Sequence, residues 1–475
     1  MTELITPDLC VIGAGSGGLS VAAAAAAFGV PVVLVEKGKM GGECLNAGCV
    51  PSKALIAAAR RAHAFSGTDA FGIAAASPQI DFARVHDHVK SVIAAIAPND
   101  SKERFGGLGV RVIEGAARFK DKHVVAVGDD IEIKARRIVI ATGSSPVIPP
   151  IPGLKTTPFL TNDSVFDLTA CPEHLIVLGA GPMGLELAQA FRRLGAAVTV
   201  LDAGTPLAHE DAECARIVLD QLAEEGVALR QGISVTRVEA DAWGIAVILG
   251  AGATYARIVG SHLLVATGRR PNVEGLALEA ARIKHKPAGI VVNRGLRTSN
   301  RRVYAIGDVA GGPQFTHAAN YHAGLVIKNA LFRLPVKADD SLIPRVTFTD
   351  PELAHVGLTE DEARRVRRAI RVLRWPLREN DRAQAERTTR GHIKVITDQR
   401  GTILGATIVG PGAGELIVPW ALARANRLNI RAIAGTVVPY PTFGEIGKRA
   451  AISYFLPRLT SPFVRRIIGW VRSLG

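Results

Sequence analysis

The sequence predicts an α/β protein of three domains, the first two built around parallel sheets and the last an α+β unit. Two patterns lead to this fold class. A run of strand, glycine turn, helix and strand occurs twice, and after Pro344 it gives way to alternating strands with helices between them. The length agrees, because 475 residues, 48% of them hydrophobic and 21% charged, suffice for about three domains with ample core.

Each copy of the glycine-turn pattern is closed by an acid 23 residues after its first glycine. The first copy comprises strand 9–12, Gly13, Gly15 and Gly18, helix 19–28, strand 31–35 and Glu36. The second comprises strand 175–178, Gly179, Gly181 and Gly184, helix 185–194, strand 197–201 and Asp202. Such a turn lets the backbone and a helix N-terminus approach a pyrophosphate, while the acid accepts hydrogen bonds from ribose hydroxyls. Two complete copies therefore predict two Rossmann-like dinucleotide-binding domains.

Three later segments, 137–143, 263–268 and 303–308, are strand-like and are each expected to return to a parent sheet. The third would bring Asp308 beside a cofactor, so the first domain is expected to be interrupted by the second and then completed. The expected division is a first cofactor domain over 1–147 and 272–342, a second over 148–271, an α+β domain over 343–460 and a tail helix over 461–475.

The cysteine content and the N-terminus favour a cytoplasmic protein. Five cysteines in 475 residues are far fewer than a secreted disulfide framework requires. Residues 1–8 lack the basic and apolar regions of a signal peptide. The apolar stretch 19–35 is broken by Gly29 and Pro31, so it is too irregular to span a bilayer.

Cys44 and Cys49 lie five residues apart in segment 41–53, directly after the first glycine-turn unit. No second Cys or His pair lies nearby to complete four zinc ligands, so no metal site is expected. If the segment opens a helix, the positive N-terminal end would lower the pKa of one thiol, as a redox-active dithiol requires. The alternative is a pair of purely structural cysteines.

Together with the two nucleotide units, segment 41–53 resembles the class I flavoprotein (pyridine nucleotide-disulfide) oxidoreductases. That family includes dihydrolipoamide dehydrogenase, glutathione reductase and mercuric reductase. The resemblance covers residues 8–455 and includes segments 345–352 and 379–386 of the last domain. It implies the family's fold, a bound FAD, and a homodimer formed through a C-terminal dimerisation domain.

The resemblance also implies roles for single residues. Cys49 would form the thiolate next to the flavin, Cys44 would exchange with substrate, and Lys53 would pair with Glu186. The residues implied to bind FAD are Gly13, Gly15, Gly18, Glu36, Lys53, Ala116, Gly143, Asp308 and Thr316. Those implied to bind the nicotinamide nucleotide are Gly179, Gly181, Gly184, Asp202, Val235 and Gly268.

Asp202 favours NADH over NADPH. A carboxylate at this position accepts a hydrogen bond from the ribose 2′-hydroxyl and repels a 2′-phosphate. Residues 203–206 contain no arginine that could accommodate such a phosphate.

The chain departs from most of the family in segment 440–445. Most relatives carry His-Pro-Thr-x-x-Glu there, and the histidine, supplied by the partner subunit, acts as an acid–base group. Here the ends of the motif are Tyr440 and Glu445. A phenol with a pKa of ~10 donates a hydrogen bond but is a poor base at neutral pH. Mercuric reductase also has tyrosine there, but it needs a C-terminal cysteine pair, and no cysteine follows Cys214. The alternative is that Tyr440 packs at the dimer interface.

The expected function is therefore that of an FAD-dependent NAD(P)H:disulfide oxidoreductase resembling dihydrolipoamide dehydrogenase. Hydride from NADH would pass through FAD to the Cys44–Cys49 disulfide and on to a small-molecule or lipoyl dithiol/disulfide substrate. One alternative is a metal-ion reductase of the mercuric type without the C-terminal cysteine pair. Another, of a different class, is an E3-like interaction subunit of a lipoyl or membrane assembly.

The net charge of +14 is concentrated in the last third, because residues 343–475 hold 22 basic and 11 acidic side chains. Its tail, 461–475, predicts a short amphipathic helix that begins at Ser461 and Pro462 and has arginines on one face. Such a helix suits a peripheral contact with the inner face of a membrane, although it could instead pack on the dimer or stay solvated. The chain has no nucleic-acid-binding motif, so no such partner is expected.

Overall fold

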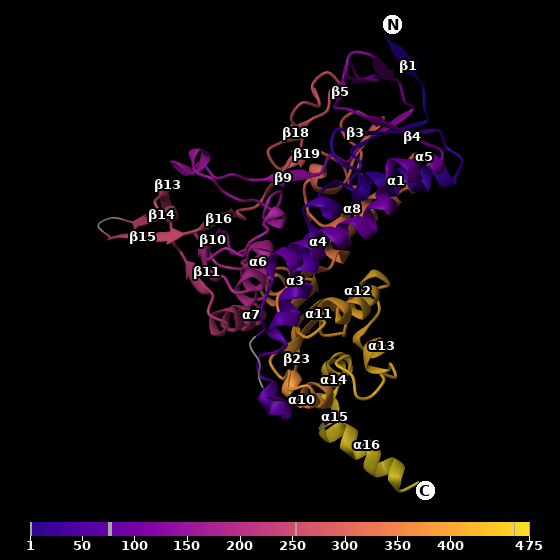
Figure 1. The fold of residues 1–475 in the computed structure, drawn as a ribbon. Helices are drawn as coiled ribbons and strands as arrows, with labels where there is room; N and C mark the ends of the chain where they lie inside the picture. Colours follow the sequence, from indigo (N-terminus) through magenta and orange to yellow (C-terminus); the bar gives the residue numbers. More distant parts are fainter. Residues whose placement is uncertain (1, 75–77, 252–253, 460, 475) are drawn as a thin grey trace. The chain divides into compact units, whose positions relative to one another are not determined.

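The computed structural model describes residues 2–74, 78–251, 254–459 and 461–474 (Figure 1). The chain divides into two compact units. The first comprises Met1–Ala203 and Val227–Asp340, and the second comprises Gly204–Gly226 and Ser341–Gly475. Both units are mixed α/β, and each is described separately below.

The first unit is centred on a five-stranded parallel sheet in the order β20-β8-β2-β3-β4. Its strands are β2 (Leu9–Ile12), β3 (Val32–Glu36), β4 (Val110–Glu114), β8 (Arg137–Ile140) and β20 (Val303–Ala305). Helices α1 (Ser16–Ala27) and α8 (Thr316–Ala330) pack together, and their buried alanines and valines share a core with this sheet. The chain thus returns to its first sheet at β20, as the strand pattern predicted.

A second parallel sheet in the same unit has the order β12-β11-β10-β16. Its strands are β10 (His174–Leu178), β11 (Ala197–Asp202), β12 (Ala228–Gln231) and β16 (His262–Val265). Helix α6 (Pro182–Arg193) connects β10 to β11, so the strand-turn-helix-strand pattern is confirmed for both copies. Together with the antiparallel C-terminal sheet, the two parallel sheets confirm the predicted α/β class with Rossmann-like units.

Smaller sheets and helices complete the first unit. The additional strands are β1 (Glu3–Ile5), β5 (Ala117–Phe119), β6 (Val125–Val127), β7 (Ile131–Ile133), β9 (Ser144–Pro146), β13 (Val235–Asp241), β14 (Gly244–Ala251), β15 (Thr254–Gly260), β17 (Arg269–Pro271), β18 (His285–Lys286) and β19 (Gly289–Ile290). The additional helices are α2 (Gly42–Asn46), α3 (Cys49–His63), α4 (Phe82–Ile96) and α5 (Lys102–Gly107), with 3₁₀ turns η1 (Thr68–Phe71), η2 (Ala97–Asp100), η3 (Leu154–Thr156), η4 (Val165–Asp167) and η5 (Gly307–Ala310).

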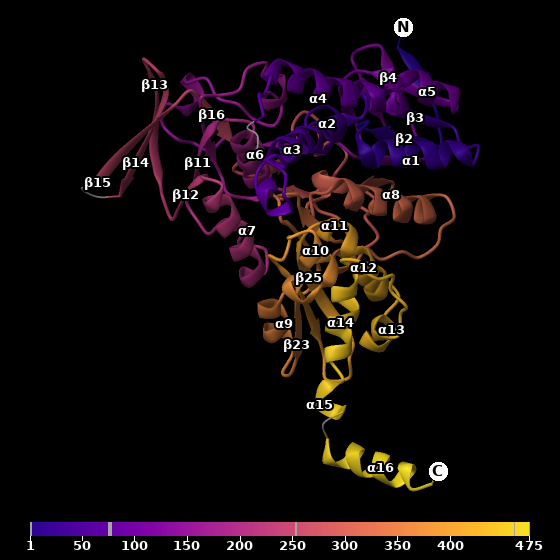
Figure 2. The same ribbon diagram turned by 60° about the horizontal axis from the view of Figure 1, so that its bottom comes forward.

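The second unit is built on an antiparallel sheet in the order β21-β22-β25-β24-β23 (Figure 2). Its strands are β21 (Arg345–Thr347), β22 (Glu352–Gly357), β23 (Arg371–Pro376), β24 (His392–Thr397) and β25 (Ile403–Gly410). Its helices are α7 (Ala212–Glu224), α9 (Glu360–Val366), α10 (Asp381–Ala385), α11 (Ala413–Leu416), α12 (Val418–Ala425), α13 (Ile430–Ala434), α14 (Glu445–Ser453), α15 (Leu456–Leu459) and α16 (Pro462–Arg472), with 3₁₀ turns η6 (Asp340–Leu342) and η7 (Leu377–Glu379). None of the helices among the described residues is long and apolar enough to cross a membrane.

Alternate side chains of β24 point to opposite faces of this sheet, one apolar and one with a charged cluster. Ile393 and Val395 point into the core formed with α12 and α14. Lys394, between them, points to the other face, and its side chain is only 5% exposed. The ammonium group lies 2.8 Å from Asp211, 3.0 Å from Glu213 and 2.8 Å from Glu360. A buried lysine therefore holds the start of α7 against the sheet.

The ion pairs of this cluster shift the pKa values of the side chains that form it. Burial alone would raise the pKa of Glu213, but hydrogen bonds from Arg374 and Lys394 lower it to about 2. A lowered carboxylate pKa stabilises the fold above the pKa of the unfolded chain, ~4.3, and this stability is lost as the pH falls towards 2.

We expect Lys394→Met to lower the free energy of unfolding of the second unit by about 3–5 kcal/mol at neutral pH, because it leaves buried carboxylates without their cation. The loss should shrink as the pH falls below ~4, where the carboxylates become protonated. Thermal unfolding at several pH values measures it. The exposed Lys328→Met is the matched control, with an expected change below ~0.5 kcal/mol. Equal losses in the two variants would contradict a structural role for the cluster.

Candidate active site

The two glycine turns share the same backbone geometry. Gly13 has φ +104° and Gly179 has φ +107°, a region that disfavours other residues. A Cβ atom on Gly18 would lie 1.9 Å from the carbonyl oxygen of Gly13, and one on Gly184 would lie 2.1 Å from that of Gly179. In both turns, therefore, the helix packs directly on the preceding loop, and a side chain at either position would push it away.

Both helices that follow these turns begin without a side-chain cap. Gly15 precedes α1 and Gly181 precedes α6, and neither first turn contains an acidic residue. The acids at the strand ends are close to the same loops, since Glu36 accepts a hydrogen bond from the Ala14 amide at 2.5 Å and Asp202 one from the Ala180 amide at 2.6 Å. Uncapped amides with an adjacent carboxylate fit the pyrophosphate and ribose of a dinucleotide at each turn.

The dithiol segment lies directly on the first glycine turn. A Cβ atom on Gly42 would lie 2.7 Å from the Cα atom of Gly15, so the two loops are in contact. Cys44 lies in α2, and Cys49 is the first residue of α3, as a helix-opening dithiol segment predicted. The structure holds both as free thiols, and the Cys49 sulfur lies 3.5 Å from the hydroxyl oxygen of Thr316.

The pKa values of the two thiols are shifted in opposite directions because the thiols are hydrogen-bonded to each other. The hydrogen bond from Cys44 is the largest cause that lowers the pKa of Cys49, with further lowering by Thr316 and by the charge of Lys53, against burial. The same hydrogen bond and burial raise the pKa of Cys44. Cys49 is thus the thiolate of the pair, and Cys44 is the protonated partner.

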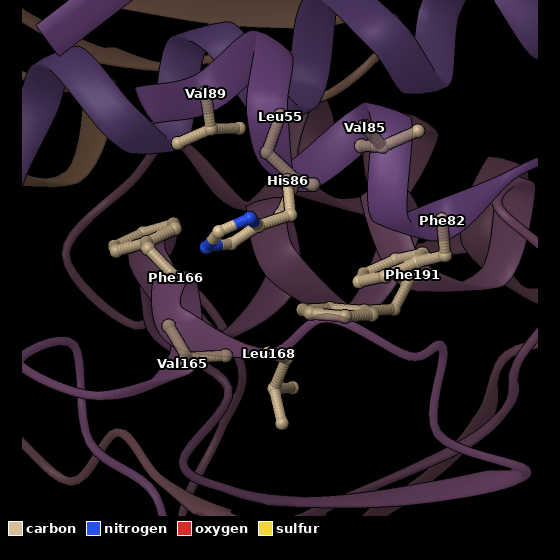
Figure 3. A pocket seen from close by; sticks show the side chains of 9 residues that line it. All are labelled: Leu55, Phe82, Val85, His86, Val89, Val165, Phe166, Leu168 and Phe191. Carbon is tan, nitrogen blue, oxygen red and sulfur yellow. The ribbon is translucent and has the colours of Figure 1, made fainter. Parts of the chain in front are cut away.

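Lys53 lies one helical turn after Cys49 and forms an ion pair with Glu186 of α6 at 2.8 Å. The Glu186 side chain is nearly fully buried, and the ammonium group of Lys53 supplies an opposite charge to its carboxylate. Apolar packing keeps the helices in place. Figure 3 shows the pocket where Leu55 of α3 faces Phe82 of α4 and Phe191 of α6, whose rings stack with centroids 5.9 Å apart.

A second ion pair fixes the dithiol segment from its other side. Arg269 of β17 donates to both carboxylate oxygens of Glu43, at 2.7 Å for the first. It also donates to the Ser144 hydroxyl at 2.8 Å, which itself donates to Asp308 at 2.5 Å. Burial raises the pKa of Glu43 to about 7, although the Arg269 charge opposes the shift. Glu43 is therefore only partly charged at neutral pH, and the guanidinium stabilises this charged form against the cost of burial.

In the second unit, Tyr440 lies on an exposed loop and its ring is 69% exposed. Its hydroxyl donates a hydrogen bond to Asp381 at 2.8 Å, and this bond raises the pKa of the phenol. Glu445 is the first residue of α14, shortly after this loop.

The remaining predicted residues lie in a 3₁₀ turn, at the first residue of a helix or strand, or in the connections between strands. Asp308 is in η5, Thr316 begins α8, Gly143 lies between β8 and β9, Ala116 between β4 and β5, Val235 begins β13, and Gly268 lies between β16 and β17. Within the described part of the chain, no three or more His, Cys, Asp or Glu side chains are grouped so as to hold a metal ion.

Comparison with known proteins defines the class. The family model of pyridine nucleotide-disulphide oxidoreductases matches residues 7–323, and the model of the family's dimerisation domain matches residues 343–451. The chain therefore belongs to the pyridine nucleotide-disulphide oxidoreductases, which are FAD-dependent flavoenzymes that use NAD(P)H. The second match also supports a homodimer.

Individual relatives carry two different names. The chain is 36% identical over 454 residues to a mercuric reductase of Streptomyces lividans, with 94% of this chain and 96% of the relative covered. It is 35% identical to a dihydrolipoyl dehydrogenase of Geobacillus stearothermophilus, with the same coverage. Among solved structures, LpdA of Mycobacterium tuberculosis superimposes with a TM-score of 0.86 at 28% identity, covering 96% of this chain and all of that one. A Cu(II) complex of the HOCl-induced flavoprotein disulfide reductase RclA from Escherichia coli gives 0.84 at 28%, covering 94% and 99%.

Sequence reasoning missed Glu43 and Arg269 at the dithiol segment of the first unit, and Asp381, which accepts the hydrogen bond of Tyr440 in the second unit. Two of them lie in segments that the resemblance already singled out, 41–53 and 379–386. The available signal for Glu43 was a carboxylate inside a glycine-rich, partly buried segment, which requires a nearby cation.

We expect Cys44→Ala to raise the pKa of the Cys49 thiol by roughly 1 unit relative to Cys44→Ser, because serine keeps a hydrogen-bond donor beside the thiolate and alanine does not. The pH dependence of Cys49 alkylation by iodoacetamide, followed on its peptide by mass spectrometry, measures the difference. Lys53→Met in the Cys44→Ser background should also raise the pKa. Identical titration midpoints for serine and alanine would show that the hydrogen bond does not set the thiolate.

We expect Arg269→Met to lower the free energy of unfolding by about 1–3 kcal/mol well above neutral pH, where it leaves Glu43 charged and unpaired. Because the pKa of Glu43 is already raised to about 7, the loss should become small under acidic conditions, where this carboxyl is protonated. Thermal unfolding across pH measures this. Adding Glu43→Gln should restore most of the loss at high pH, and a pH-independent loss would argue against the pair.

Proposed function

We propose that this chain is an NADH-dependent disulfide reductase of the dihydrolipoyl dehydrogenase type that works as a cytoplasmic homodimer on a small-molecule or lipoyl disulfide. The observation that carries the proposal is the thiol pair at the start of α3. Cys49 there has a lowered pKa, Cys44 beside it stays protonated, and the Lys53–Glu186 ion pair lies one turn away. Asp202 supports NADH, because a carboxylate at this strand end suits a free 2′-hydroxyl.

In the proposed reaction, FAD bound at the first glycine turn and Glu36 would supply the transfer of an electron pair from NADH. This transfer reduces the Cys44–Cys49 disulfide to a protonated Cys44 and a Cys49 thiolate. Cys44 then transfers its proton along the hydrogen bond to Cys49 as its sulfur attacks the substrate disulfide. A mixed disulfide forms, and the first substrate sulfur leaves as a thiol with the proton that Cys49 received. Cys49, again a thiolate, next attacks the Cys44 sulfur, which re-forms the internal disulfide, and the second substrate sulfur leaves and takes a proton from solvent. The hydride of NADH and one proton from solvent thus end in two substrate thiols.

Lys53 would stabilise the Cys49 thiolate in this cycle, and Glu186 would keep the lysine in place. Glu43 and Arg269 would fix the dithiol segment on the first glycine turn. Tyr440 of the partner subunit would lie at the mouth of the site. Its raised pKa means that the phenol keeps its proton at neutral pH, so it would donate a hydrogen bond to a leaving sulfur without acting as a base.

A second candidate is two-electron reduction of a thiol-bound metal ion such as Hg(II). Tyr440 stands where most of the family has the acid–base histidine, which favours a substrate that needs no proton transfer. Relatives named mercuric reductase are as similar to this chain as those named dihydrolipoyl dehydrogenase. In this case both thiolates, Cys44 and Cys49, would hold the ion.

The deciding experiment is an anaerobic NADH titration of the flavin-loaded dimer, followed by separate additions of lipoamide, glutathione disulfide and Hg(II). We expect lipoamide to reoxidise the enzyme and NADPH to reduce it about 10-fold more slowly than NADH, which equals about 1.4 kcal/mol of discrimination at Asp202. Reoxidation by Hg(II) alone would favour the metal-ion reductase. Slow reoxidation by all three would favour an E3-like interaction subunit of a lipoyl or membrane assembly.

The variant Tyr440→His tests the same proposal from the partner side. A histidine has a pKa near neutrality and can act as an acid and a base. The variant should therefore reduce lipoamide about 10- to 100-fold faster than the native enzyme at neutral pH if proton transfer limits the native enzyme. The rate of Hg(II) reduction should not increase. A lower rate of lipoamide reduction in the variant would show that the phenol itself is required.

A further inference from the structure

Helix α16 (Pro462–Arg472) has one apolar and one basic face. At 100° per residue the apolar side chains cover a single continuous side of the helix. They are Phe463, Val464, Ile467, Ile468, Trp470 and Val471. Arg465 lies on the polar side, while Arg466 and Arg472 flank the apolar face, beside Trp470 and Ile468 respectively.

The apolar face of this helix is not packed into the protein. Phe463 is 69% exposed, Trp470 64%, and Leu474, which follows the helix, 68%. Ile467, Ile468 and Val471 are also exposed, and no residue of α16 is buried. A run of exposed large apolar side chains on one face marks an interaction surface rather than ordinary solvated surface.

The charge around this helix is not compensated within its own unit. Segment 204–226 has six acidic residues and one basic residue, whereas 341–445 has 16 basic and 11 acidic residues, so the two segments cancel. Their charges meet directly in ion pairs such as Arg345–Glu210, Arg374–Glu213 and Arg390–Glu224. Residues 446–475 contain six basic residues and no acidic one. The whole net charge of the second unit therefore comes from its C-terminal end.

We propose that α16 docks the protein onto an anionic lipid surface, with the helix lying in the plane of the interface. Its 11 residues rise only ~16 Å, which is too short to cross a bilayer core of ~30 Å. In the plane of the surface, the apolar face enters the acyl boundary and the arginines lie among lipid phosphates.

The arrangement of the two faces favours lipid over a second copy of the chain. A second α16 would cover the apolar face but would add further arginines and leave all of them without counter-charges. Trp470 borders Arg466 at the edge of the apolar face, the position at which an indole ring lies when a helix is half-immersed at a membrane interface. One anionic surface satisfies both faces at once.

The test is co-sedimentation of the flavin-loaded full-length protein with vesicles of phosphatidylcholine alone, or of phosphatidylcholine and phosphatidylglycerol in equal amounts, at low ionic strength. We expect binding to the anionic vesicles only, and its loss when residues 461–475 are deleted. The triple variant Arg465→Gln, Arg466→Gln and Arg472→Gln should weaken the apparent affinity on the order of 100-fold, since each surface arginine contributes about one kcal/mol.

The matched control removes three exposed arginines elsewhere in the same unit, Arg365→Gln, Arg367→Gln and Arg368→Gln. It has the same net charge as the α16 variant and should keep most of the binding. Equal weakening in both variants would overturn the proposal in favour of a diffuse charge effect. Equal binding to neutral vesicles would also overturn it.

The apolar face is tested by Phe463→Ser and Ile467→Ser, which keep all arginines. The affinity for anionic vesicles should fall at least 10-fold. On these vesicles the tryptophan fluorescence of the native protein should shift to the blue, and this shift should be absent in a Trp470→Phe variant. Retained binding in the serine variant would overturn an immersed helix. Self-association through α16 is tested by sedimentation of the protein without vesicles. A smaller assembly after deletion of residues 461–475 would show that α16 pairs with a second copy of itself instead of with lipid.

Discussion

The position of Cys49 at the first residue of α3 is the constraint on which the rest of the site depends. Free amides and the helix dipole at this end favour a thiolate. Lys53 follows four residues later and so lies on the same side of the helix as Cys49. Because Lys53 also pairs with the nearly buried Glu186 of α6, a rotation of α3 would break this ion pair. One ion pair thus orients the helix and adds positive charge near the thiolate.

The two glycine turns differ in whether another loop of the chain packs on them. The first turn is covered, because Gly42 lies against Gly15 and brings the dithiol segment onto it. The second turn is open, since a Cβ atom on Gly181 would have no neighbour within 4 Å. A covered turn suits a cofactor that stays bound, and an open one suits a nucleotide that enters and leaves in each cycle. The same local sequence therefore lies in two different surroundings.

The sequence predicted features that are repeated or local, and it missed pairs that are distant in the chain. The glycine turns, their closing acids Glu36 and Asp202, and the return of β20 to the first sheet follow from spacing and strand pattern. The Lys53–Glu186 pair came only from the family resemblance. The Glu43–Arg269 pair joins residues 226 positions apart and has no periodic signature. It forms because β17 pairs antiparallel with β9, which brings Arg269 beside the dithiol segment. No local sequence pattern records that contact.

The charge of the last third has two physically different parts. Within the antiparallel sheet, basic residues are matched by the acidic segment 204–226, and Lys394 at the centre of that match is buried, so the fold itself requires this charge. In residues 446–475 no acid is present, and the arginines of α16 are exposed. Uncompensated, exposed charge repels itself and gives the folded chain no stability. The proposed anionic lipid surface, which carries negative charge over an apolar interior, would compensate these arginines and cover the continuous apolar face beside them.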